Sequence, residues 1–295
     1  MKAPKKELLK FCRPDLYAIS NFESRKLLCQ HCSNYKDTFG SWLKILEGIP
    51  DTKKDPERFA AALNAWGLTE APNMEELHEY FSECVEYQPS FEFLKNSVRI
   101  SSFSSQRFNP LIWSSYADGL HGFCIVFDEK VLMDKEQGSE LRDVEYSCSA
   151  PTVDTFEYAI AHDQYIFHQL ALEEEITSLR QQEQDYTTKV IEDYKTAADK
   201  AFTKKREFWH KIFAVKPSEL EYECERRLIV PVDLKDNSPS FFTYSSDAVI
   251  EVILGEDMNK RYRKKLYGLI KERYPEVTIS TAHRAKNGTG IEVSP

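Results

Sequence analysis

Acidic and basic side chains crowd into residues 222–231 of the sequence. Glu223, Glu225 and Arg227 are spaced two residues apart, so in an extended chain their side chains share one face. Neighbouring carboxylates disfavour joint ionisation, and a cation beside them relieves the repulsion. One carboxylate is then held charged and oriented while the other stays adjustable, which suits acid–base or electrostatic catalysis. An exposed edge strand protected by charge accounts for the same pattern without chemistry.

Hydroxyl and aromatic side chains are concentrated in residues 99–122. Alternation along a strand places Ser102 and Ser104 on one side of the strand end. Trp113 and Tyr116 follow at helical spacing. Such a segment can line a pocket with hydroxyls and one ring, and it can equally be a strand edge beside a small aromatic core.

Other chemical signatures are missing from the sequence. It has no glycine-rich nucleotide loop, no zinc-protease motif and no esterase nucleophile motif. Cys29 and Cys32 form a C-x-x-C pair with no second pair at zinc-ribbon distance, so we expect reduced thiols and no metal site. The basic stretch 260–265 is typical of a solvated helix face.

Length and charge narrow the class of protein. The chain has 295 residues and a formal net charge of −9, which argues against a protein that coats nucleic acid or an anionic membrane. No apolar run approaches the roughly 18 residues of a spanning helix. We therefore expect a cytoplasmic protein that binds no membrane.

The elements that must position these residues follow from periodicity. No glycine occurs between residues 139 and 254, and apolar residues recur at helical spacing through 153–216, which predicts a long helical hairpin with its turn at 180–188. Alternating and apolar runs predict strands at 98–103, 122–127, 227–232, 248–254, 277–281 and 291–293, and helices at 57–66, 74–87 and 259–273. The prediction is a single α+β domain, 1–295, with a small mixed or antiparallel sheet and the hairpin as an insertion.

Five sequence blocks follow one another along the chain. They are Leu8-Leu9-Lys10-Phe11, the Asn21-led helix running to residues 34–39, Ser102-Phe103-Ser104, Trp113-Ser-Ser-Tyr116-Ala-Asp118, and Lys216 followed by Tyr222-Glu223-Cys-Glu225-Arg-Arg227. In this order the blocks resemble the bacterial domain-of-unknown-function family DUF2971. Thr38 stands where this family usually has proline. Members often look like bacterial defence or toxin proteins, so the resemblance implies an effector.

The order of the blocks is also similar to that in ADP-ribosyltransferases, which implies their fold and NAD as the substrate. Cleavage of the nicotinamide bond builds positive charge on the ribose, and a carboxylate facing that carbon stabilises the transition state. By this resemblance Glu225 is the catalytic carboxylate, and Glu223 assists or orients the acceptor. Lys10 would bind ribose or phosphate, and Ser102 and Ser104 would shape the cofactor pocket. Tyr116 would stack on nicotinamide, and Arg227 and Trp113 would brace the site structurally.

Two further functions are compatible with the same residues. A magnesium-dependent nuclease would use Glu223 or Glu225 with Asp233 and Lys235. A non-catalytic sensor or interaction module would use Glu223 and Arg227 in a structural ion-pair network. Under the enzymatic hypothesis the partners are NAD and a protein or nucleic-acid acceptor, and the helical hairpin offers a surface for a homodimer.

Overall fold

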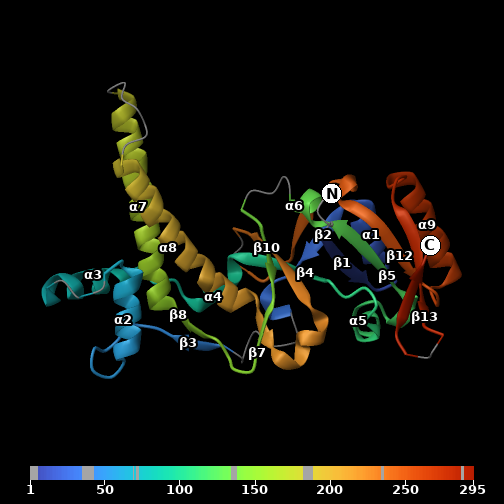
Figure 1. Cartoon of the computed structure of the whole chain (residues 1–295), viewed down its shortest axis with the longest axis horizontal. Helices are drawn as coiled ribbons and strands as arrows, with labels where there is room; N and C mark the ends of the chain where they lie inside the picture. Colours follow the sequence, from blue (N-terminus) through green and yellow to red (C-terminus); the bar gives the residue numbers. More distant parts are fainter. Residues whose placement is uncertain are drawn as a thin grey trace. The chain divides into compact units, whose positions relative to one another are not determined.

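The computed structural model describes residues 6–34, 43–68, 70, 73–133, 138–181, 189–233, 236–286 and 289–295 (Figure 1). The chain divides into two compact units. The first, here called the sheet unit, comprises residues 1–38, 95–148 and 216–295. The second, here called the helical unit, comprises residues 39–94 and 149–215, so the chain leaves the sheet unit twice and returns twice.

The sheet unit is built on eight strands in the order β14-β13-β12-β5-β1-β4-β10-β6. Their bounds are β1 (Glu7–Cys12), β4 (Val98–Ser104), β5 (Phe123–Asp128), β6 (Glu140–Asp143), β10 (Glu225–Pro231), β12 (Val249–Gly255), β13 (Thr278–Arg284) and β14 (Ile291–Ser294). Strands β12 and β13 run parallel, whereas the other neighbours pair antiparallel. The predicted α+β class with a mixed sheet is confirmed.

Both faces of this sheet are covered, which explains the continuous apolar run of β5. All six residues of that strand are buried. The consecutive residues Leu8 and Leu9 of β1 belong to cores on opposite faces, as strand alternation requires. Helices α1 (Leu16–Glu23) and α9 (Lys260–Arg273) contribute Phe22 and Leu266 to the Leu8 core, and α5 (Pro110–Tyr116) contributes Trp113 to the Leu9 core.

Shorter elements complete the sheet unit. Strand β2 (Lys26–Cys29) pairs with β11 (Ser240–Thr243). The others are α6 (Glu129–Met133), β7 (Glu145–Ser147) and the 3-10 helices η1 (Cys32–Asn34), η2 (Gly119–His121), η3 (Ser218–Glu223) and η4 (Ser246–Ala248). Strand β9 (Val215–Pro217) and helix α4 (Phe91–Asn96) lie at the places where the chain passes between the units. All seven cysteines are free, and the predicted C-x-x-C thiols of Cys29 and Cys32 are buried.

The helical unit contains the two longest helices, α7 (Thr155–Gln181) and α8 (Lys189–Phe213). The other elements are α2 (Pro56–Ala65), α3 (Met74–Glu86), and the parallel strand pair β3 (Lys44–Leu46) and β8 (Thr152–Asp154). Phe81 of α3 packs edge-on against Phe156 of α7, with ring centroids 5.1 Å apart, in the core that joins α2, α3 and α7. The sequence did not predict that residues 39–94 accompany the helical pair.

The helical pair α7 and α8 occupies the range predicted for a hairpin. The predicted turn, 180–188, falls mainly on 182–188, which lie outside the described residues. Two apolar side chains of α7, Phe167 and Leu170, are more than half exposed. A homodimer formed through this hairpin stays a prediction.

Candidate functional site

The candidate site lies where β10 begins, beside the end of β4. The two strands pair antiparallel, with Glu225 opposite Ser104 and Arg227 opposite Ser102. Glu223 is the last residue of η3, and Cys224 follows it with a left-handed φ of 42°. The sequence pattern placed Glu223, Glu225 and Arg227 on one extended segment. That expectation is wrong for Glu223, because the 3-10 helix and the left-handed residue break the strand before Glu225.

Glu225 is almost fully buried and is held by three side chains. Arg227 donates from Nε to Oε1 at 2.9 Å and from a terminal nitrogen to Oε2 at 3.2 Å. Lys216 Nζ lies 3.0 Å from Oε2, and the Ser102 hydroxyl also bonds this carboxylate. Burial raises the pKa of Glu225, but the charge and hydrogen bonds of Arg227, then Lys216 and Ser102, lower it to about 2. This carboxylate is therefore ionised at neutral pH.

Glu223 shares its cation with Glu225. Lys216 Nζ donates to Glu223 Oε2 at 2.6 Å, and the Tyr116 hydroxyl donates to Oε1 at 2.6 Å. Lys216 is 1% exposed, so the carboxylates of Glu223 and Glu225 both contact one buried ammonium group. The Ser104 hydroxyl donates to the backbone carbonyl of Glu223 at 2.7 Å, which fixes the end of η3.

Lys10 of β1 reaches the same cluster from the neighbouring strand. Its ammonium group donates to the Ser101 hydroxyl and to the Ser102 carbonyl, each at 2.9 Å, and lies 5.5 Å from the centre of the Phe103 ring. Burial lowers the pKa of Lys10, and the nearby charge of Glu225 opposes that shift. Lys10 therefore holds the backbone of the strand that carries Ser102.

Tyr146 and Lys216 are parts of the site to which the sequence gave no role. The Tyr146 hydroxyl accepts a hydrogen bond from the Glu225 backbone N–H at 2.8 Å. Burial raises the pKa of Tyr146 to about 12, so it remains a neutral phenol. Nothing in the sequence around Tyr146 marks it. Lys216 belongs to one of the sequence blocks that resemble DUF2971. Residues 219–225 contain acidic but no basic side chains, and this excess could have indicated that a nearby lysine is buried against them.

The other predicted residues are placed as follows. Tyr116 keeps 44% of its surface exposed although its hydroxyl is bound. Trp113 is buried apart from the carboxylates, where its indole N–H donates to the Arg107 carbonyl at 3.0 Å and its ring meets Phe11 edge-on at 5.1 Å. Asp233 is exposed, and Lys235 lies outside the described residues.

The cluster therefore joins the rings of Tyr116 and Tyr146, hydroxyl groups and an ionised carboxylate at a single strand end. Its carboxylate can stabilise a developing positive charge, and its exposed ring can contact a planar group. Across the described ranges, no three His, Cys, Asp or Glu side chains are grouped to hold a metal ion. None of the described helices has the length and apolar character needed to cross a membrane.

A comparison with protein families gave one match. The family described as protein of unknown function (DUF2971) matches residues 112–228, which include Tyr116, Glu223, Glu225 and Arg227 but not Lys10 or Ser102. No curated protein and no solved structure was found to match the chain. The resemblance to DUF2971 indicated by the sequence motifs is thus confirmed over residues 112–228, and the blocks at Lys10, Asn21 and Ser102 lie outside the match.

Proposed function

We propose that this protein cleaves the nicotinamide–ribose bond of NAD and transfers the ADP-ribosyl group to a macromolecule or to water. The observation that carries the proposal is convergence: Lys10, Ser102, Tyr116 and Glu225 come from four separate segments and gather around one buried ionic cluster. Such a cluster supplies fixed charge, hydroxyl groups and a ring within one site, which is what this reaction requires.

Glu225 is the charge-stabilising group in this mechanism. The pKa of about 2 keeps it ionised, so it acts as a fixed negative charge and not as a general acid. Breaking the glycosidic bond leaves positive charge on the ribose carbon, and a carboxylate facing that carbon lowers the barrier. Arg227 donates two hydrogen bonds to Glu225 and thereby fixes the orientation of the Glu225 carboxylate.

Tyr116 and Glu223 form the accessible side of the proposed site. The hydroxyl of Tyr116 is anchored on Glu223, which holds the ring in one orientation while much of its surface stays exposed. A ring held in this way can stack on a planar heterocycle such as nicotinamide. Glu223 is then positioned by Lys216 to receive the hydroxyl or amine of an acceptor.

Lys10, Ser102 and Ser104 shape the proposed pocket. Lys10 fixes the Ser102 carbonyl, and the Ser102 hydroxyl contacts Glu225 directly. Ser104 bonds the Glu223 carbonyl and accepts from the Gln106 backbone N–H, so it orders the turn beyond the strand. The family resemblance suggests a bacterial defence or toxin system as the setting for this activity.

The test is release of nicotinamide from NAD by the purified full chain, measured by chromatography with bacterial lysate as the source of acceptors. We expect Glu225→Gln to lower the rate by about a hundredfold or more, the size of effect seen when a preorganised charge is removed. Glu221→Gln is the matched control, because Glu221 is an exposed acid in η3 with no hydrogen-bonding role for its side chain among the described residues.

Folding of each variant is monitored by circular dichroism, so that loss of structure is separated from loss of chemistry. A folded Glu225→Gln protein with unchanged nicotinamide release would remove Glu225 from the mechanism. A wild-type protein that releases no nicotinamide under any acceptor condition would overturn the proposed reaction.

A second function is favoured by one observation. Every carboxylate oxygen of Glu223 and Glu225 already has a protein partner. Satisfied buried ion pairs are also found in non-catalytic modules, where they specify structure. For an interaction module, we expect no NAD turnover and co-purification of a defined partner that is lost on Tyr116→Ala, the substitution that alters the accessible ring.

A further inference from the structure

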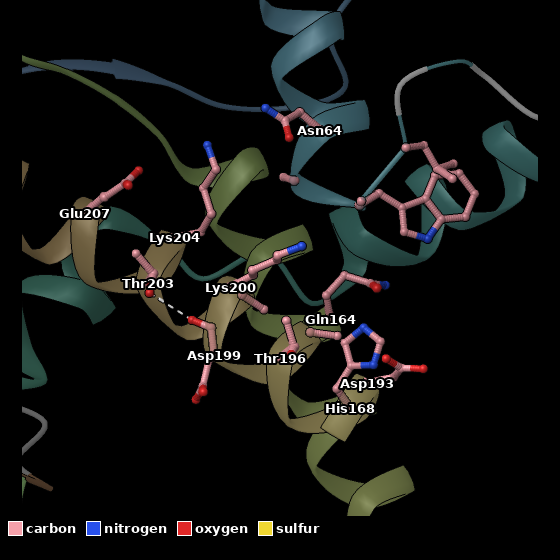
Figure 2. Close-up of a pocket in the computed structure, with 16 residues that line it drawn as sticks. Asn64, Gln164, His168, Asp193, Thr196, Asp199, Lys200, Thr203, Lys204 and Glu207 are labelled. Atoms are coloured by element: carbon pink, nitrogen blue, oxygen red, sulfur yellow. Dashed lines mark hydrogen bonds between the residues drawn. The ribbon is translucent and has the colours of Figure 1, made fainter. Parts of the chain in front are cut away.

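The helical unit contains a cavity of about 1000 Å³ that the proposed reaction does not use (Figure 2). The cavity lies between the C-terminal end of α2 and one face of α8, and α7 contributes to its lining. Asn64, Trp66, Gln164, His168 and Lys200 are among its lining residues. Its volume is at the upper end of the range typical of small-molecule sites.

Local structure explains why this space exists. Helix α2 ends where Gly67 adopts a φ of 85°, and the Leu68 N–H turns back to the Leu63 carbonyl at 2.9 Å. This cap stops the helix abruptly and leaves Trp66 in the lining of the cavity, with one face of its ring stacked on Tyr80 at 4.3 Å. On α8, Thr196, Lys200, Thr203 and Lys204 recur at intervals of three and four residues, so they share the helix face toward the cavity.

The cavity presents polar groups that lack protein partners. Lys200 makes no hydrogen bond or ion pair with any described residue, and His168 Nδ1 is buried without a hydrogen-bonding partner. Burial lowers the pKa of His168, so its ring is neutral at physiological pH and offers one donor and one acceptor. A buried polar atom without a partner is unfavourable, and a bound ligand or water relieves that cost.

Charge is distributed unevenly around the cavity. In Figure 2 the ammonium groups of Lys200 and Lys204 lie on the side of α8 nearer Asn64, whereas the Asp199 carboxylate projects to the opposite side. Lys204 is only loosely engaged, 3.6 Å from Glu157. Asp193 lies beside His168 in the same view. One end of the cavity therefore carries both lysines together with the Glu207 carboxylate, and the other combines an imidazole with a carboxylate.

We propose that this cavity binds a purine nucleotide. The phosphates would be bound by Lys200 and Lys204, whose ammonium groups make charge-assisted hydrogen bonds. The base would lie at the other end, against Trp66 and His168, where the Asp193 carboxylate accepts from the exocyclic or ring N–H groups of a purine. A nucleotide combines an anionic group, a flat ring and hydrogen-bond donors, and so it matches both ends of the cavity.

The test is isothermal titration calorimetry of the full chain with ATP, GTP, the corresponding nucleosides and inorganic pyrophosphate. We expect ATP or GTP to bind with micromolar affinity, and we expect the nucleosides and pyrophosphate to bind at least tenfold more weakly. Lys200→Gln should weaken nucleotide binding about ten- to a hundredfold, the loss expected for one charged hydrogen bond. Because Lys200 is exposed, this substitution leaves the fold intact.

Lys195→Gln is the matched control, since Lys195 is an exposed lysine of α8 that does not line the cavity. Glu225→Gln should leave nucleotide affinity unchanged, which separates this site from the proposed NAD site. The proposal is overturned if neither nucleotide binds at submillimolar concentration, if Lys200→Gln binds as tightly as wild type, or if pyrophosphate alone binds as tightly as the nucleotides.

Discussion

The carboxylate of Glu225 links the stability of the protein to pH. Its pKa falls from an ordinary value of 4.5 to about 2 on folding, so the ionised form stabilises the folded state. This stabilisation is fully present above about pH 4.5 and is lost as the pH falls through 2. We expect the free energy of unfolding in urea to fall by about 2 kcal/mol from this group between pH 5 and pH 2.5.

Glu225→Gln provides the comparison for this pH dependence, because glutamine does not titrate. Its unfolding free energy should fall less steeply with acid than that of wild type, whereas Glu221→Gln should follow wild type. Identical slopes for wild type and Glu225→Gln would show that Glu225 has an ordinary pKa.

Arg227 is expected to matter for stability more than for substrate contact. It is fully buried and bonds both oxygens of Glu225, so Arg227→Ala leaves a buried carboxylate with one cation fewer. Loss of one partner of a buried ion pair costs about 3–5 kcal/mol. Urea denaturation measures the loss, and Arg261→Ala, at an exposed position of α9, is the control. A loss below about 1 kcal/mol would contradict a bracing role.

Two glycines show how closely the elements of the sheet unit approach each other. A Cβ atom at Gly255, the last residue of β12, would overlap the Leu120 backbone of η2, and one at Gly122 would overlap the Ala117 carbonyl. The Gly255 N–H bonds the Gly122 carbonyl at 3.0 Å, so the two segments are in direct backbone contact. Only glycine permits this approach.

Gly255→Ala should therefore destabilise the protein by at least about 2 kcal/mol, because neither backbone can move without breaking strand pairing. Gly268→Ala is the matched control: Gly268 lies within α9 and faces open space, so alanine should stabilise the helix by about 1 kcal/mol. Thermal denaturation of both variants reports the difference. Equal effects of the two substitutions would exclude the steric explanation.

The elements themselves were largely predictable from sequence, because each follows a local pattern. The alternation at 98–103 and the apolar run at 122–127 correspond to β4 and β5, and the basic helix at 259–273 corresponds to α9. Short strands such as β6 and β7 carry too few residues to show a period. The left-handed Cys224 could not be predicted either, because its conformation depends on contacts such as that of its carbonyl with the Ser105 N–H.

The arrangement of the site was predictable only in part. Glu225 and Arg227 sit two residues apart on one strand, so their pairing follows from the sequence. The contact between Glu223 and Tyr116 joins positions 107 residues apart, and the one between Lys10 and Ser102 joins positions 92 apart. Local periodicity carries no information on such pairs, and only the resemblance to a family suggested that they meet. Whether they act on NAD stays a prediction.

At the scale of the whole molecule, the two candidate sites lie in different compact units. The sheet unit holds the ionic cluster of Lys216 and the two glutamates, and the helical unit holds the cavity beside Lys200. The chain leaves the helical unit at residue 215, and Lys216 is the next residue. If both proposals hold and this chain connection couples the two sites, nucleotide should alter the rate of nicotinamide release by wild type but not by Lys200→Gln. Equal rates with and without nucleotide would show that the two sites act independently.

The wide separation of Lys10 from Glu225 has a consequence for protein synthesis. Strand β1 is made before β10, whose first residue, Glu225, follows Lys10 by 215 positions. At about 5–20 residues per second, the ribosome needs roughly 10–40 s to cover that interval. A nascent chain that ends between Ser104 and Glu225 therefore has the lysine and the serines but lacks the carboxylate to which we assign charge stabilisation. If the proposed reaction acts on the dinucleotide pool of the producing cell, the chain stays inactive until Glu225 has been synthesised.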